Sequence, residues 1–175
     1  MTDNELRLRA CEPEDLEVMY ELENNPSMWE VSCTTTPYSR YILRQYLEQA
    51  TGDMFTDKQV RFMVERVADG KVLGCVDLTN YEPLHDRAEI GMAISSDYQG
   101  QGIGRRALRL LCQYAYTHLH LHQMVAYIPA DNEACLQMFR SEGFTSHLHL
   151  KEWLRGADGK YKDAVLVQCL LTNSL

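Results

Sequence analysis

A glycine-rich run in the middle of the chain has the composition of a ligand-binding loop: Gln99-Gly100-Gln101-Gly102-Ile103-Gly104. An apolar strand pattern at 88–94 precedes it, and apolar residues recur at helical spacing over 107–115. Glycine lets the backbone approach a ligand closely, and the start of a helix offers unpaired N–H groups and a positive dipole end. Arg105 and Arg106 are unfavourable near the positive end of that dipole. Binding of a phosphorylated ligand therefore explains these two cations better than helix stability does. The run therefore predicts a pyrophosphate-binding loop.

Two other nucleotide motifs fit this run less well. Residues 102–107 match the dinucleotide fingerprint GxGxxG weakly, and no βαβ unit with an acidic ribose ligand follows. The P-loop ending Gly-Lys-Ser/Thr is absent. The remaining alternative is a glycine turn that caps the helix for structural reasons alone.

The length of 175 residues predicts one domain, residues 1–175. Hydrophobic periodicity places it in the α/β class, with helices on a mixed sheet. The expected order is β-α-α-β-β-β-α-β-α-β-β, with the second helix beginning at Ser39 as N-cap. Strands are expected at 6–10, 61–65, 72–78, 88–94, 124–128, 145–153 and 164–171.

Composition excludes several classes of protein. The chain has 175 residues, 45% of them hydrophobic, and a formal charge of −8, which disfavours disorder and nucleic-acid binding and favours cationic partners. No apolar run approaches the roughly 20 residues of a membrane span, and the polar start is unlike a signal peptide. Six cysteines without a CxxC pair indicate a reducing compartment. We expect a cytoplasmic protein that does not bind membranes.

Three motifs in register resemble those of the GNAT acetyltransferases. The glycine run resembles their coenzyme A pyrophosphate loop, (Q/R)xxGx(G/A). Residues 129–134 are similar to the second family element, in which Asn132 and Ala134 start the helix beside the pantetheine arm, and 139–144 resemble the ending (Y/F)xxxGF. The element order matches the superfamily from Leu6 to Leu171.

The resemblance implies an enzyme that moves acetyl from acetyl-CoA to a primary amine by direct attack in a ternary complex. Backbone groups of Met92, Ala93 and Ile94 would hold the pantetheine and polarise the thioester carbonyl. The implied cofactor contacts also include the glycine run with Arg105, then Asn132, Ala134, Phe139 and Arg140. A coenzyme A-binding sensor domain that has lost catalysis is the alternative.

Within the superfamily the chain looks most similar to spermidine N-acetyltransferases and to ribosomal-protein N-terminal acetyltransferases, on residues 22–26, 87–90 and 156–164. This implies a polyamine-like small amine or a peptide N-terminus as acceptor. The polyamine enzymes carry an acidic pair before the Pro-Tyr that opens the second helix. Here that stretch is neutral apart from Glu30, so a main polyamine-binding feature is missing.

An amine with a pKa near ~10 must lose a proton before it attacks, so a base helps. Glu89, on the strand that leads to the loop, is the candidate, and a solvent-facing charge is the alternative. The usual tyrosine acid is replaced by Phe139, which has no proton to give. Tyr127 is the candidate substitute, and a packed strand aromatic is the alternative.

Three acidic residues are candidates for binding a cationic acceptor: Glu30, Glu82 and Asp86. Histidines 118, 120, 122, 147 and 149 invite a metal hypothesis. However, 118–122 straddles a helix end and a strand start, where alternate residues need not share a face. We expect no metal site, and a homo-oligomer as the assembly.

Overall fold

The computed structural model describes residues 5–25, 36–156 and 159–172. Its sheet has seven strands in the order β1-β2-β3-β4-β5-β7-β6. The strands are β1 (Leu6–Ala10), β2 (Val60–Arg66), β3 (Val72–Glu82), β4 (Arg87–Ile94), β5 (Gln123–Pro129), β6 (Thr145–Arg155) and β7 (Tyr161–Leu170). The helices are α1 (Leu16–Glu23), α3 (Arg40–Gln49), α4 (Met54–Asp57), α5 (Ile103–Thr117) and α6 (Glu133–Ser141), with 3-10 turns η1 (Pro13–Asp15) and η2 (Ser96–Tyr98).

The predicted mixed α/β sheet and its main element order are confirmed. Ser39 caps α3, since its hydroxyl accepts a hydrogen bond from the Ile42 N–H at 3.2 Å. The four-residue helix α4 was not predicted because it is too short to show a period. It begins where the Asp53 carboxylate accepts the Phe55 N–H at 3.1 Å.

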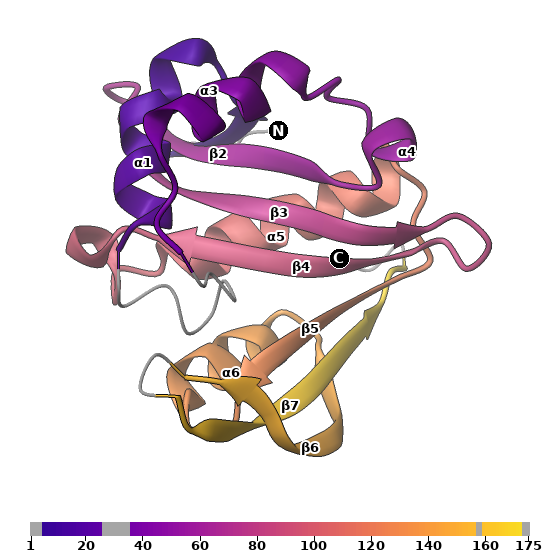
Figure 1. The fold of residues 1–175 in the computed structure, drawn as a ribbon. Helices are drawn as coiled ribbons and strands as arrows, with labels where there is room; N and C mark the ends of the chain where they lie inside the picture. The colour runs from indigo at the N-terminus through magenta and orange to yellow at the C-terminus, as the bar shows by residue number, and fades with distance from the viewer. Residues whose placement is uncertain (1–4, 26–35, 157–158, 173–175) are drawn as a thin grey trace.

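Parallel pairing between β4 and β5 covers only three positions, Arg87–Glu89 against Gln123–Val125. Every other neighbouring pair of strands is antiparallel. Beyond Glu89 the two strands diverge (Figure 1), while β4 stays paired with β3 as far as Ile94. Residues 91–94 therefore keep one hydrogen-bonding edge that none of the described strands covers.

Helices cover both faces of the sheet (Figure 1). One face carries Phe62, Val76 and Leu78, and belongs to the main core together with the buried stripe of α5. The other face carries Met63 and Cys75, which pack with buried residues of α1 and α3. Because alternate strand residues share a face, the polar side chains of residues 61, 77 and 89 lie on the α1/α3 side. None of the described helices is long and apolar enough to cross a membrane.

Candidate active site

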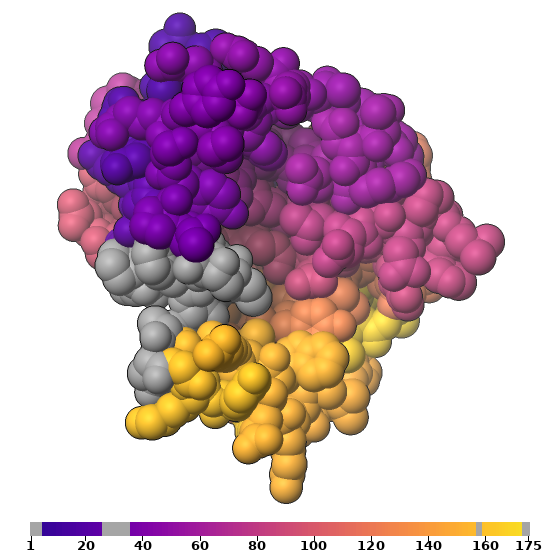
Figure 2. Space-filling model, viewed as in Figure 1, coloured from indigo at the N-terminus to yellow at the C-terminus, as the bar shows by residue number. Residues whose placement is uncertain are grey.

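A cavity of about 610 Å³ opens on the α1/α3 side of the sheet. Figure 2 shows the hollow between the purple N-terminal helices and the pink and orange strands. It is lined from α1, α3, β2, β3, β4, β5 and α6, so it reaches the place where β4 and β5 diverge. Its polar lining consists of Glu23, Tyr38, Tyr46, Gln59, Arg61, Asp77, Thr79, Glu89 and Tyr127.

The uncovered edge of β4 forms one wall of this cavity. Met92 and Ala93 line it, whereas Ile94 is buried and does not, and the contact of all three with pantetheine stays a prediction. A strand edge presents N–H and C=O groups that an extended ligand can pair with, as an added strand would. An amide-containing arm such as pantetheine has the hydrogen-bonding groups for this. The edge therefore fits the group that the sequence motifs imply.

The glycine loop follows β4 after the short turn η2 and has the expected backbone. Gly100 and Gly102 have φ of +72° and +76°, a region that side chains disfavour, and Gly102 is the N-cap of the 15-residue helix α5. A Cβ added at either position would meet nothing within 4 Å, so open space lies in front of the loop. The Gln99 amide donates to the Ile94 carbonyl at 3.0 Å and ties the loop to the end of β4. Gln101 donates within the turn, to the Asp97 carbonyl at 3.0 Å.

Two further residues of this loop contact the protein interior, and their contacts with the cofactor stay predictions. A Cβ at Gly104 would lie 3.1 Å from the Met138 sulfur and 3.4 Å from the Met92 sulfur, so close packing also favours a small residue at this position. The Ile103 side chain is buried in the core, which leaves its backbone alone for a ligand.

The two arginines of the first turn of α5 have protein partners. Arg105 binds Glu142, which Arg109 also binds, and Arg106 pairs with Glu5. These carboxylates explain the two cations without a phosphorylated ligand, contrary to the expectation from the sequence. A contact of the half-exposed Arg105 with the cofactor stays a prediction.

The second family element starts α6 beside the cavity. The Asn132 side chain caps the helix by accepting the Cys135 N–H at 3.2 Å, and Ala134 is exposed in the first turn. Phe139 is buried, lines the cavity and packs edge-to-face on Phe144. Arg140 is exposed and pairs with Glu133 at 3.1 Å, on a side of α6 that does not line the cavity.

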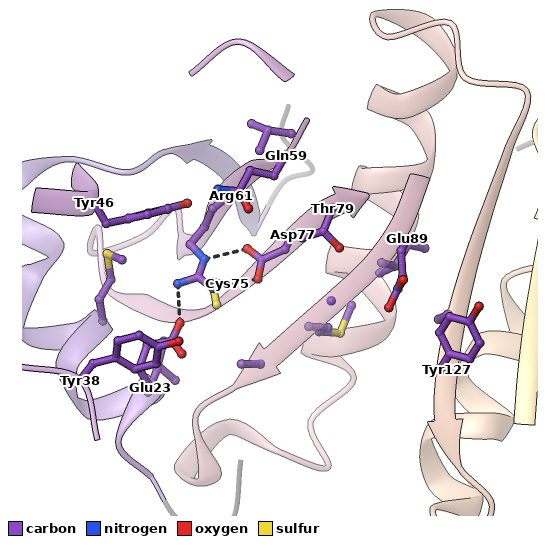
Figure 3. Close-up of a pocket in the computed structure, with 18 of the residues that line it drawn as sticks. Glu23, Tyr38, Tyr46, Gln59, Arg61, Cys75, Asp77, Thr79, Glu89 and Tyr127 are labelled. Carbon is purple, nitrogen blue, oxygen red and sulfur yellow. Dashed lines mark hydrogen bonds and ion pairs between the residues drawn. The ribbon is translucent and has the colours of Figure 1, made fainter. Parts of the chain in front are cut away.

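The candidate base and acid stand on neighbouring strands, β4 and β5 (Figure 3). Glu89, half-buried on β4, accepts a hydrogen bond from the Asn80 amide at 3.0 Å. Within the described residues it has no cationic partner. Tyr127, half-buried on β5, stacks on Trp153 with ring centroids 5.8 Å apart. Both line the cavity, so the structure brings these two predicted residues together.

Three charged cavity residues were missed by the sequence reasoning: Glu23, Arg61 and Asp77. Arg61 binds Asp77 through two N–H groups at 2.7 and 2.9 Å and donates a third to Glu23 (Figure 3). Although burial alone would lower the pKa of Arg61, the charges of Asp77 and Glu23 raise that pKa well above its ordinary value. A carboxylate that interrupts an apolar strand, as Asp77 does in 72–78, was the available signal.

The predicted acceptor residues lie elsewhere. Glu82 and Asp86 belong to the β3–β4 hairpin, at the opposite end of β4 from the glycine loop, and neither lines the cavity. Glu82 instead binds Arg87 at 2.8 Å. Glu30 lies outside the described residues.

Two cysteines line the cavity, Cys75 and Cys135. Burial raises the pKa of Cys75 to about 12 and that of Cys135 to about 11. Both are therefore protonated at neutral pH, and neither has the thiolate that a nucleophilic mechanism needs.

Metal is expected to be irrelevant to the protein. In the described ranges, no three His, Cys, Asp or Glu side chains are grouped so as to hold an ion. His149 bonds Asp163 at 2.7 Å and His147 bonds Thr145 at 2.6 Å. Treatment with a chelator should leave turnover and Tm unchanged. Stoichiometric zinc in the purified protein, with activity lost on its removal, would contradict this.

Comparison with known proteins identifies the family. A family model described as Acetyltransferase (GNAT) domain matches residues 5–145. The spermidine N(1)-acetyltransferase of Escherichia coli K12 is 30% identical over 161 residues, which cover 91% of this chain and 83% of the relative. The crystal structure of spermidine N-acetyltransferase from Vibrio cholerae, in complex with CoA and spermine, superposes with a TM-score of 0.87 at 25% identity and 97% coverage of both chains. A putative ribosomal N-acetyltransferase of Bacillus subtilis is 28% identical over 102 residues, 58% of this chain and 55% of that one. The expected fold and family are thereby confirmed: the chain belongs to the GNAT acetyltransferase family.

Proposed function

We propose that this chain is an N-acetyltransferase that moves acetyl from acetyl-CoA to a small primary amine by direct attack in a ternary complex. The observation that carries the proposal is that one cavity joins the uncovered edge of β4 to a set of acidic side chains. The acetyl donor and the amine could therefore lie next to each other at Glu89, within one cavity. The protonated thiols of the cavity support transfer without an acyl-enzyme.

Acetyl-CoA would supply an acetyl thioester. The backbone N–H groups of the 99–104 loop, at the start of α5, would hold its pyrophosphate, and the edge at residues 91–94 its pantetheine arm. On that edge, backbone N–H groups can donate to a carbonyl oxygen and polarise it. Asn132 caps the start of α6, and Phe139 lies on its cavity side, so both would lie beside the pantetheine arm.

The acceptor enters from the α1/α3 side as an ammonium ion. The described charged lining there is three carboxylates, Glu23, Asp77 and Glu89, against one cation, Arg61, so the cavity attracts cations. Glu89 takes the proton that the amine must lose before it attacks. Tyr127, across the gap on β5, donates a proton to the leaving sulfur in place of the tyrosine that Phe139 replaces.

Two kinds of relative suggest two kinds of acceptor. The relatives from Escherichia coli and Vibrio cholerae are named for spermidine, and the one from Bacillus subtilis for ribosomal N-acetylation. The cavity volume of about 610 Å³ supports a small amine over a peptide N-terminus. The test is release of free thiol from acetyl-CoA with a panel of amines and N-terminal peptides. Binding of acetyl-CoA without turnover on any amine would favour the alternative, a sensor domain.

Tyr127→Phe should lower kcat by roughly tenfold to 100-fold while leaving KM for acetyl-CoA unchanged, because the variant keeps the stacked ring on Trp153 and removes the proton donor. The measurement is steady-state kinetics with the best amine of the panel. Tyr41→Phe, an exposed tyrosine on α3 outside the cavity, is the matched control. An unchanged kcat for Tyr127→Phe would show that Tyr127 contributes packing and no proton transfer.

A further inference from the structure

The charged residues of the acceptor cavity are unequally available to a substrate. Arg61 and Asp77 face each other across β2 and β3, and Glu23 is the last residue of α1. The guanidinium uses Nε and Nη2 on Asp77 and Nη1 on Glu23. These three side chains are 15–19% exposed, so solvent screens the contacts only weakly.

This cluster changes the number of ammonium groups that the cavity can accept. Two of the three described carboxylates are already bound to a fixed cation, which leaves Glu89 without a cationic partner among the described residues. Asp77 is opposite Gly91, two residues along β4 from Glu89, so Asp77 and Glu89 are diagonal neighbours roughly 7–8 Å apart. A second ammonium placed near Glu89 would therefore approach Arg61, and like charges at that range are unfavourable.

The rest of the lining suits an apolar group. Three residues line the cavity on the α3 side: Tyr38, Leu43 and Tyr46. The Arg61 Cζ lies 5.8 Å from the centroid of the Tyr46 ring. Gly91 adds no side chain to the cavity wall beside Asp77, where a Cβ would lie 3.4 Å from the Asp77 Cβ and 3.5 Å from Oδ2. A flat or branched apolar body can lie against Leu43 and Tyr46 while its amine points to Glu89.

We infer that Arg61 determines acceptor specificity: it makes this cavity selective for a small monocationic amine with an apolar body, such as an arylalkylamine, and against polyamines. The inference rests on the proposed function, and it names the class of amine that the same site takes. Arg61 acts here by occupying Asp77 and Glu23, and it has no part in the proton transfer.

The test compares kcat/KM for phenethylamine and for spermidine in the wild type and three variants. The wild type should prefer phenethylamine. Arg61→Gln removes the positive charge beside both carboxylates and should move the preference toward spermidine by roughly tenfold or more. Glu23→Gln makes the cavity less negative and should move the preference the other way. Arg40→Gln removes an exposed pairing with Glu17 on the neighbouring helices and should leave the ratio unchanged.

Failure of the specificity inference and failure of the proposed function give different results. Equal losses on both amines in Arg61→Gln, a wild-type preference for spermidine, or a preference for N-terminal peptides would overturn the inference. Should Arg61→Gln not fold, the wild-type preference and the opposite shift in Glu23→Gln still decide it. If no amine releases thiol, the proposed function fails, and calorimetric binding of the two amines to the wild type then tests the charge preference by itself.

Discussion

Glu89→Gln is expected to lower kcat/KM by about 10²–10⁴-fold, the usual contribution of a general base. The amide keeps the size of the side chain, and its oxygen can still accept the Asn80 hydrogen bond, so the loss would come from proton transfer. The position is half-buried between an open strand edge and the acceptor cavity. The measurement is thiol release with the best amine, alongside calorimetric affinity for acetyl-CoA.

Glu48→Gln is the control for this variant. Glu48 is exposed on α3 and does not line the cavity, so its replacement should change neither quantity. Wild-type kcat/KM in Glu89→Gln would eliminate Glu89 as the base and leave water as the proton acceptor. A parallel loss of acetyl-CoA affinity would instead assign Glu89 to binding.

Gly102→Val should weaken acetyl-CoA binding by at least roughly tenfold. At φ +76° any side chain costs about 1–2 kcal/mol in backbone strain, and a β-branched one projects into the open space in front of the loop. A tenfold increase in Kd corresponds to about 1.4 kcal/mol of lost binding free energy. We expect at least this loss when a side chain keeps the phosphate away from the backbone. The affinity is measured by calorimetry, and folding by thermal unfolding.

Gly52 offers a matched control because it shares the conformation without the proposed role. Its φ is +70°, a Cβ there meets nothing within 4 Å, and it lies between α3 and α4, away from the loop. Gly52→Val should therefore lower Tm by a comparable amount and leave the affinity unchanged. Equal affinities for wild type and Gly102→Val would show that the loop does not hold the pyrophosphate.

The sequence by itself determined the features that depend on neighbouring residues. The element order follows from hydrophobic periodicity, and the Ser39 and Asn132 caps from side chains one turn before their targets. The positive φ at Gly100 and Gly102 follows from glycine in a turn before a helix. Glu89 could be assigned to the strand before the glycine loop because the loop follows it at a short, fixed distance in sequence. Each is set within about ten residues.

The tertiary structure alone decided which charges meet. Arg61 is 16 residues from Asp77 and 38 from Glu23, and strand register together with the packing of α1 brings them into one cluster. Arg105 is neutralised by a carboxylate 37 residues away, which no local pattern could reveal. An ion pair depends on two positions in space, whereas periodicity reports only which face of its own element a residue occupies. The backbone of the glycine loop was therefore predictable from the sequence, and the charge arrangement of the cavity was not.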